Sequence, residues 1–321
     1  MHIDIVGGSG FIGTSLCKNF DRKNINFSIM DKALSKAFPE KVNIGDICSI
    51  QDLEKCLSDN SILINLAAEH RDDVSPVSLY HEVNVQGAKN ICYVAVKKNI
   101  NTIIFTSSVA VYGFCEAETN ENGLINPFNE YGKTKYEAEL VYKKWQSEDP
   151  ILRKLIIIRP TVVFGEGNRG NVYNLFEQIM SNYFFMIGKG FNKKSLAYVE
   201  NVSALLNFAI NIDSQFEIIN YSDKPDYTMN ELVNKIKQIL NKKIQNNRFY
   251  IPYFIGISIG KIVDLIAILL NRKFSISAVR IKKFCANSIY SSSSHLFDKF
   301  KPPYSLDEGL IRTIKFEFLD D

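Results

Sequence analysis

The residues of this chain with the clearest capacity for chemistry are Tyr131 and Lys135, which stand four positions apart. On a helix this spacing puts both side chains on one face. A free phenol has a pKa of roughly 10, too high for a base at neutral pH, but a neighbouring cation favours the phenolate and lowers that pKa. The pair therefore predicts a tyrosine that takes a proton from a hydroxyl group while a nicotinamide takes hydride. Because the same spacing occurs by chance on exposed helices, the interpretation depends on two upstream features.

The first supporting feature is a pair of serines that follows an apolar strand. Residues 102–106 have the composition of a buried strand, and Ser107 and Ser108 come directly after it. Ligands bind at the carboxyl ends of strands in open α/β sheets. Ser108 is therefore predicted to hydrogen-bond the same substrate oxygen that Tyr131 deprotonates.

The second supporting feature is a glycine-rich loop at the N-terminus. Residues 2–6 form an apolar strand, and three glycines with the spacing G-x-x-G-x-x-G follow it. Glycines at these positions permit a tight turn, close approach of the backbone to a pyrophosphate, and contact between helix and strand. The amides at the start of the following helix then face the phosphates. The residues predicted to contact a dinucleotide here are Gly7, Gly10, Phe11, Ile12 and Gly13.

An acidic residue ends the second predicted strand, 27–30. Asp31 lies about 20 residues beyond the glycines, where a carboxylate receives the adenosine ribose hydroxyls. A carboxylate repels a 2′-phosphate, which favours NAD over NADP, and the adjacent Lys32 weakens that preference slightly.

Strand and helix patterns alternate through the first half of the chain, which predicts an α/β fold with a Rossmann-type, doubly wound parallel sheet. Strands are expected at 2–6, 27–30, 62–66, 102–106 and 155–159, with a further strand ending at 45–47. Helices are expected at 11–21, 50–58, 78–98 and 130–147. We expect an NAD-binding domain at 1–165 and a smaller, mostly helical substrate domain at 166–321. Within the latter, 196–222 is expected to return to the main sheet through 198–202 and 216–220.

The composition of the 321 residues, with 46% hydrophobic and 23% charged, is ordinary for a soluble globular protein. No secretory signal and no nucleic-acid motif is recognised. Neither the six cysteines nor the four histidines have metal-ligand spacing, so reduced cytosolic thiols and no metal are expected.

Residues 224–321 contain 16 Lys and Arg against 9 Asp and Glu. This excess suits an anionic substrate or membrane surface, and a solvated basic face without a partner is an equal alternative.

Two further segments have chemical interest. Residues 165–171 form a polar, glycine-rich loop before a predicted helix, where Arg169 could hold a phosphate, or where the loop could be a simple connection. Residues 250–270 are strongly apolar, but Lys261, Asp264 and helix-weakening residues make a membrane span doubtful. A helix lying in the membrane interface and a helix packed into the small domain both fit this segment.

Together, the glycine loop, Ser108, Tyr131 and Lys135 resemble the extended short-chain dehydrogenase/reductase superfamily, the NAD-dependent nucleotide-sugar epimerases and dehydratases. Within it, the chain resembles bacterial 4-epimerases of N-acetylglucosamine linked to undecaprenyl diphosphate. The runs that carry this closer resemblance are 65–76, 159–171, 194–201, 223–226 and 279–286.

This resemblance implies roles for individual residues. Further NAD contacts are implied for Asp46, Ile47, Ala67, Lys135 and Pro160. Contacts with the sugar diphosphate are implied for Arg169, Asn171 and Arg280. Residues 69–71 depart from the pattern of UDP-galactose 4-epimerase, so substrate contacts cannot be transferred from that enzyme.

The implied activity is C4 epimerisation through a 4-keto intermediate, giving the N-acetylgalactosamine lipid for O-antigen or surface glycan assembly. A 4-reductase of a UDP-4-keto-6-deoxy sugar, a 4-epimerase of free UDP-N-acetylglucosamine and a catalytically silent NAD-binding scaffold remain alternatives. A 4,6-dehydratase is disfavoured, because Val109 and Ala110 stand where those enzymes usually carry an acidic pair. The resemblance also implies a homodimer through 78–98 and 130–147, on the cytoplasmic face of the bacterial inner membrane with peripheral contact through 250–270.

Overall fold

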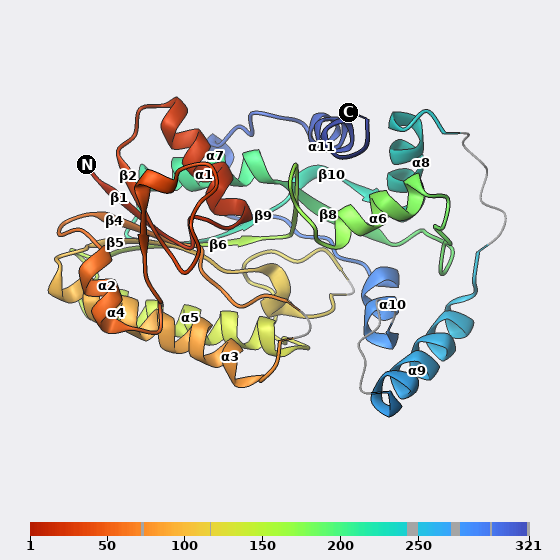
Figure 1. Cartoon of the computed structure of the whole chain (residues 1–321), viewed down its shortest axis with the longest axis horizontal. Coiled ribbons are helices and arrows are strands. Elements are labelled where there is room, and N and C mark those ends of the chain that lie inside the picture. The colour runs from red at the N-terminus through yellow and green to blue at the C-terminus, as the bar shows by residue number, and fades with distance from the viewer. Residues whose placement is uncertain (72–73, 116, 243–249, 271–276, 296, 320–321) are drawn as a thin grey trace.

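A seven-stranded parallel sheet forms the centre of the computed structural model, which describes residues 1–321 except 72–73, 116, 243–249, 271–276, 296 and 320–321 (Figure 1). The strand order is β3-β2-β1-β4-β5-β6-β9, and every pairing is parallel. The strands are β1 (Ile3–Val6), β2 (Phe27–Asp31), β3 (Val42–Ile44), β4 (Ile62–Asn65), β5 (Thr102–Thr106), β6 (Lys154–Pro160) and β9 (Phe216–Tyr221). The chain reverses its direction across the sheet between β1 and β4, and such switch points are where open α/β sheets bind ligands.

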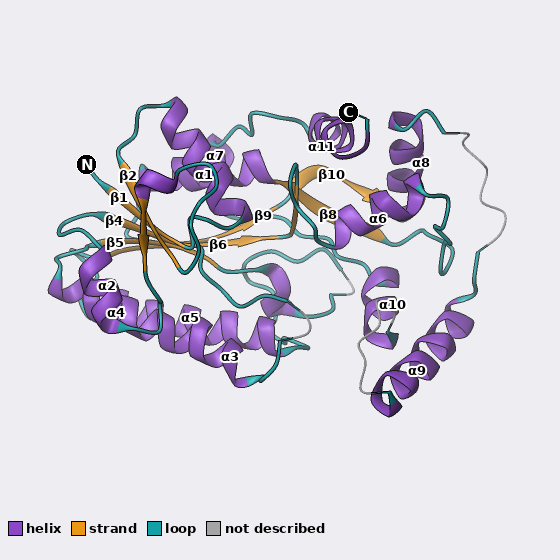
Figure 2. Ribbon diagram, viewed as in Figure 1, coloured by secondary structure: helices purple, strands orange, loops and turns teal. Residues whose placement is uncertain are grey.

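Helices cover both faces of this sheet (Figure 2). One face is covered by α1 (Phe11–Arg22) and α7 (Val199–Ile210), which pack against each other. The other face is covered by α2 (Ile50–Cys56), α3 (Ser78–Tyr80), α4 (Gly87–Lys97) and α5 (Glu130–Ser147). The central strands are largely apolar along their length because both of their faces are buried.

A smaller sheet of three strands lies beyond the carboxyl ends of the main sheet, in the order β10-β8-β7. Its strands are β7 (Val162–Phe164), β8 (Lys193–Tyr198) and β10 (Asp223–Thr228). The helices that share its apolar core are α6 (Asn171–Met180), α8 (Met229–Ile239) and α11 (Leu306–Phe318). Two of them begin with a capping box, Thr228 with Glu231 for α8 and Ser305 with Glu308 for α11.

Two helices form the edge of the molecule opposite the N-terminus, α9 (Tyr253–Leu269) and α10 (Ala278–Cys285) (Figure 1). They pack against each other. Within the described ranges, no helix combines the length and apolar character that crossing a membrane requires.

The strand and helix predictions for the first half are confirmed to within about two residues, with two differences. The third strand ends at Ile44, before the predicted 45–47. The predicted helix 78–98 runs from α3 through a π-helical segment, His81–Gln86, into α4. Residues 216–220 do return to the main sheet, as part of β9. The prediction that 198–202 return to it is wrong, because β8 ends at Tyr198 in the small sheet and α7 begins at Val199. The domain boundary at 165 stays a prediction.

Candidate active site

The glycine loop is packed too closely to tolerate side chains at two positions. Gly7, at the end of β1, has φ +82°, and a Cβ there would lie 2.6 Å from the backbone nitrogen of Ala67. A Cβ on Gly13 would lie 2.6 Å from the carbonyl oxygen of Gly7. These contacts bring the ends of β1 and β4 against the start of α1, whose first turn contains no acidic residue. The loop backbone, without side chains at these two positions, thus lies at the positive end of a helix, which fits a dinucleotide pyrophosphate.

Asp31 lies beside this loop, as predicted. Its carboxylate accepts hydrogen bonds from the backbone N–H of Ser9 at 3.0 Å and of Ala33 at 3.1 Å. Lys32 pairs with the carboxylate of Asp46, which lies 3.1 Å from its Nζ. This pairing offsets the positive charge that weakens the preference for NAD over NADP.

Four other residues predicted to contact the cofactor have side chains that belong largely to the core. Phe11 and Ile12 pack against the core of the small sheet, and Ile47 is buried against Gly87. Pro160 is buried at the end of β6, where it pairs with Tyr221. Direct contacts of these residues with NAD stay predictions.

The structure brings Ser108 and Tyr131 together through a tight helix contact. The α5 helix is capped by Asn129, whose side chain accepts a hydrogen bond from the N–H of Gly132. A Cβ on Gly132 would lie 2.4 Å from the carbonyl oxygen of Ala110, so α5 packs directly on the 3₁₀ turn Val109–Tyr112. Ser108 caps that turn. The glycine next to Tyr131 therefore sets the distance between the two catalytic candidates.

The pKa values of Tyr131 and Lys135 differ from the prediction. Burial raises the pKa of Tyr131 to about 12, and this outweighs the lowering effect of a hydrogen bond with Ser108. Burial lowers the pKa of Lys135 to about 7, partly opposed by the charge of Glu139. The predicted lowering of the Tyr131 pKa by Lys135 is not found in this structure, because burial of the phenol has the largest effect on its pKa and the group that lowers it is Ser108.

A buried ion pair behind Lys135 was not predicted from the sequence. Glu139, one turn beyond Lys135 on α5, is fully buried, and Arg159 of β6 is 2% exposed. Arg159 donates two hydrogen bonds to this carboxylate, at 2.8 and 2.5 Å, and Ser107 donates a third at 2.6 Å. The pair therefore holds α5 to the ends of β5 and β6, where Ser108 emerges. The sequence feature that could have indicated this pair is Arg159, an arginine within an otherwise apolar strand.

Asn84 is a second supporting residue that sequence reasoning missed. It lies in the π-helical segment and is buried. Its side chain bonds both backbone groups of Glu69 and donates to the hydroxyl of Thr134 at 3.0 Å. It thus connects the loop after β4 to the helix turn between Tyr131 and Lys135. No spacing rule in the sequence indicated this role.

The residues implied for the sugar diphosphate lie in separate elements. Arg169 is paired with Glu317 of α11 at 2.7 Å and lies over the ring of Tyr173. Asn171 is the first residue of α6, and Arg280 lies in the first turn of α10. The ion pair with Glu317 therefore directs Arg169 toward α11, and the binding role of all three stays a prediction.

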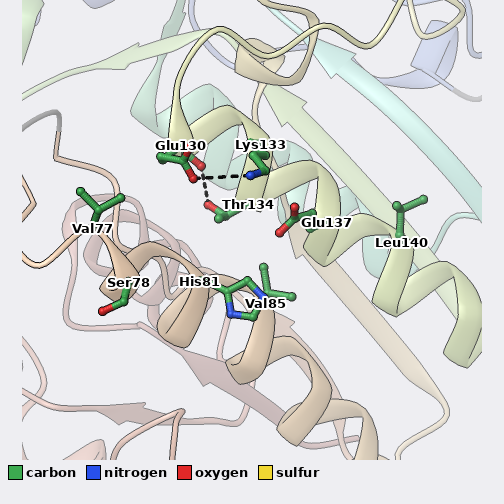
Figure 3. A pocket seen from close by; sticks show the side chains of 9 residues that line it. All are labelled: Val77, Ser78, His81, Val85, Glu130, Lys133, Thr134, Glu137 and Leu140. Carbon is green, nitrogen blue, oxygen red and sulfur yellow. Dashed lines mark hydrogen bonds and ion pairs between the residues drawn. The ribbon is translucent and has the colours of Figure 1, made fainter.

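A cavity of about 480 Å³ lies on the outer side of α5 and is distinct from this site (Figure 3). Its lining residues on α5 include Glu130, Lys133, Glu137 and Leu140, whereas Tyr131, Lys135 and Glu139 do not line it. The outer cavity lies between α5 and the helical segment that runs from α3 to α4.

The glycine loop, its acidic residue and the serine–tyrosine–lysine group define a dinucleotide-dependent enzyme class. A sequence model of the NAD dependent epimerase/dehydratase family matches residues 3–221. The chain belongs to this family, and its cofactor is NAD.

Individual proteins are also similar to this chain over nearly its whole length. The chain is 44% identical over 316 residues to the N-acetyl-alpha-D-glucosaminyl-diphospho-ditrans,octacis-undecaprenol 4-epimerase of Escherichia coli O157:H7, covering 98% of this chain and 95% of that protein. The same fold occurs in the UDP-N-acetylglucosamine 4-epimerase from Bacillus cereus, with a TM-score of 0.76 at 18% identity, covering 100% of this chain and 98% of that one. It also occurs in MoeE5 in complex with UDP-glucose and NAD, with a TM-score of 0.77 at 18% identity and 98% of both chains covered.

The contact between Gly13 and the loop backbone predicts a cofactor-binding defect. A Gly13→Ala change forces the loop open against strain of about 1–3 kcal/mol, which corresponds to roughly 5- to 150-fold weaker NAD binding. Gly10→Ala is the matched control, because its Cβ would lie 3.3 Å from the carbonyl oxygen of Gly7 and needs a smaller shift. Calorimetric titration with NAD measures both affinities, and we expect Gly13→Ala to bind NAD more weakly than Gly10→Ala. Equal affinities in the two variants would contradict the prediction.

Proposed function

We propose that this protein is an NAD-dependent sugar 4-epimerase that acts on N-acetylglucosamine linked to undecaprenyl diphosphate. Its product is the N-acetylgalactosamine lipid used for O-antigen or surface glycan assembly. The observation that carries the proposal is the 44% identity, over nearly the whole chain, to the Escherichia coli O157:H7 epimerase. The residues that the chemistry needs, Ser108, Tyr131 and Lys135, are all present.

In this proposal Tyr131 takes the proton of the C4 hydroxyl, and Ser108 holds the same oxygen by a hydrogen bond. Bound NAD supplies a reversible hydride acceptor for C4. The 4-keto sugar turns over within the site, so that C4 is reduced on its opposite face. Tyr131 then returns the proton, and the reaction consumes no reductant overall. Lys135, buried one helix turn away with its Nζ over the ring of Phe105, would hold the nicotinamide ribose.

The diphosphate holds the substrate while the sugar turns. The start of α6 offers backbone amides at Asn171 for one phosphate. Arg169 and Arg280 supply cations from the preceding loop and from α10. To bind the phosphate, Arg169 must break its ion pair with Glu317, whose side chain is 3% exposed in that pair.

The second candidate is 4-epimerisation of free UDP-N-acetylglucosamine. The fold shared with the Bacillus cereus enzyme favours it, although 18% identity supports the fold alone. The chemistry at C4 would be the same, and only the group beyond the diphosphate would differ.

The proposal also includes a homodimer. The dimer forms through α3–α4 and α5, where Val77, Tyr93, Val96 and Leu140 are exposed apolar residues, two of which line the cavity of Figure 3.

In this proposal the protein works at the cytoplasmic face of the inner membrane and contacts the bilayer through residues 250–270. This location lets the sugar enter the site while the undecaprenyl chain stays in lipid.

A substrate comparison tests the proposal. The purified protein with catalytic amounts of NAD is offered N-acetylglucosamine as the undecaprenyl diphosphate and as the UDP derivative, and the C4 epimers are separated. We expect conversion of the lipid-linked sugar, at a kcat/KM at least about tenfold higher than for the nucleotide, a difference of about 1.4 kcal/mol. Conversion of the UDP sugar alone supports the second candidate, and a requirement for stoichiometric NADH supports the 4-reductase.

A further inference from the structure

Two segments that are distant in sequence but adjacent in the structure expose apolar side chains. The first segment is the α9 helix. The second is the loop of residues 183–191, which we call the aromatic loop and which lies between α6 and β8. The loop is joined to the residues just before α9 by backbone hydrogen bonds at 2.8 Å, from Gly188 N–H to Ile251 and from Ile251 N–H to Met186.

The apolar residues of α9 are exposed on one side. Those between 40% and 70% exposed include Phe254, Ile255, Ile259, Ile262, Leu265 and Ile266. At 100° per residue they fall within one arc of the helix. The arc contains one polar residue, Ser258, and its hydroxyl donates to the carbonyl oxygen of Phe254. This arc therefore presents apolar surface with its polar group already satisfied.

The opposite side of α9 faces the protein. Cβ atoms on Gly256 and Gly260 would lie 2.7 Å from Ile187 and 2.8 Å from the backbone of Ala278. Asp264 accepts a hydrogen bond from the N–H of Ala278 at 3.0 Å, at the start of α10. The one acidic residue of α9 is thus turned inward, away from the apolar arc.

The aromatic loop shows the same division. Met186 is buried, and Ile187 packs on α9. Tyr183, Phe185 and Phe191 are between 68% and 77% exposed. Backbone hydrogen bonds join this loop to the residues just before α9, so two adjacent segments each expose apolar side chains.

The charge of these segments identifies what covers the surface. In these segments and the residues beside them, the described parts of 181–195 and 250–286 contain one acidic residue, Asp264, and six Lys and Arg residues. A seventh cation, Lys194, is not counted because its amine donates to backbone carbonyls of the protein. Apolar residues with aromatic rings among an excess of cations match an anionic lipid surface, where apolar groups enter the acyl boundary and cations remain at the headgroups. The interior of a protein partner would offer no comparable use for so many cations.

The same surface connects to the catalytic site through α10. Lys282 and Lys283 lie over the rings of Phe114 and Phe128, at 4.8 and 5.0 Å from the ring centroids. These two rings stack on each other and belong to the segment between Ser108 and Tyr131. A helix that packs on α9 therefore also contacts the chain segment that joins the catalytic residues.

We propose that α9 and the aromatic loop together dock on an anionic bilayer and hold the substrate entrance at the lipid surface. The inference rests on the proposed function and extends it by adding the aromatic loop, which the sequence did not indicate.

Vesicle co-sedimentation of the full chain with NAD tests this proposal without substrate. We expect binding to vesicles containing phosphatidylglycerol and weaker binding to pure phosphatidylcholine. Ile262→Glu on α9 and Phe185→Glu on the loop should each reduce vesicle binding at least about tenfold. Ile151→Glu is the matched control, because Ile151 is equally apolar, is exposed, and lies outside both segments. Retained NAD binding in each variant shows that the fold persists.

Three outcomes would overturn the inference. These are no binding of the unaltered protein to anionic vesicles, normal binding by Phe185→Glu, and loss of a dimer in Ile262→Glu without any vesicle binding. The last would assign the surface to a second copy of the chain. Turnover of a short-chain, water-soluble diphosphate substrate should be unchanged in both variants. If the unaltered protein converts no N-acetylglucosamine derivative while vesicle binding follows the expectation, the proposed function fails and the docking surface stands.

Discussion

Replacing Tyr131 by Phe is expected to lower kcat by about 10²–10⁴-fold, the range for losing a positioned general acid–base. The ring remains, so the packing of α5 against the turn at Ser108 is kept. Only the hydroxyl that exchanges the C4 proton is removed. NAD affinity should stay close to that of the unaltered protein, since the cofactor's pyrophosphate site lies at the glycine loop. Initial rates of epimer formation at saturating substrate measure the effect.

Tyr142→Phe is the matched control for this prediction. Tyr142 is a buried tyrosine on the same helix, and its hydroxyl accepts a hydrogen bond from Asn65 at 2.8 Å. Loss of that bond should reduce the free energy of unfolding by about 0.5–1.5 kcal/mol and leave kcat nearly unchanged. If Tyr131→Phe retained as much activity as Tyr142→Phe, Tyr131 could not be the acid–base group.

Replacing Glu139 by Ala is expected to reduce the free energy of unfolding by about 3–5 kcal/mol, the range for breaking a buried ion pair. Burial lowers the pKa of Arg159, but the hydrogen bonds and charge of Glu139 outweigh this effect and hold it above its ordinary value. Without the carboxylate, a buried guanidinium remains uncompensated, and Ser107 loses its acceptor. Urea unfolding followed by circular dichroism measures the change.

Glu148→Ala provides the comparison for an exposed pair. Glu148 lies just beyond the same helix and pairs with Arg153 at 3.0 Å, but it is largely exposed. Its loss should cost about 0–1 kcal/mol. A Glu139→Ala variant that is no less stable than Glu148→Ala would show that the buried pair does not hold α5 to the sheet.

The sequence was sufficient to predict the parallel sheet and to place the glycine loop and the helix that carries Tyr131 and Lys135. The reason is that both depend on short-range patterns. Apolar runs bounded by glycine or acidic residues indicated the strands, and the spacing of Gly7, Gly10 and Gly13 indicated the loop. The four-residue separation of Tyr131 and Lys135 was enough to predict that they share one helix face.

The features that the sequence did not predict depend on contacts between distant segments. The apolar run at 198–202 fits a strand and a helix, and packing of α7 on α1 decides for the helix from Val199 onward. The pKa of Lys135 depends on how deeply α5 is buried. The bond from Asn84 to Thr134 joins residues 50 positions apart, which no local spacing reveals.

The most direct test of the central claim uses N-acetylglucosaminyl-diphospho-undecaprenol carrying deuterium at C4. We predict that the N-acetylgalactosamine product keeps the deuterium at C4, with catalytic NAD and no net formation of NADH, because the hydrogen leaves and returns within one site. Loss of the label to solvent, or product formation only with stoichiometric NADH, would contradict the account.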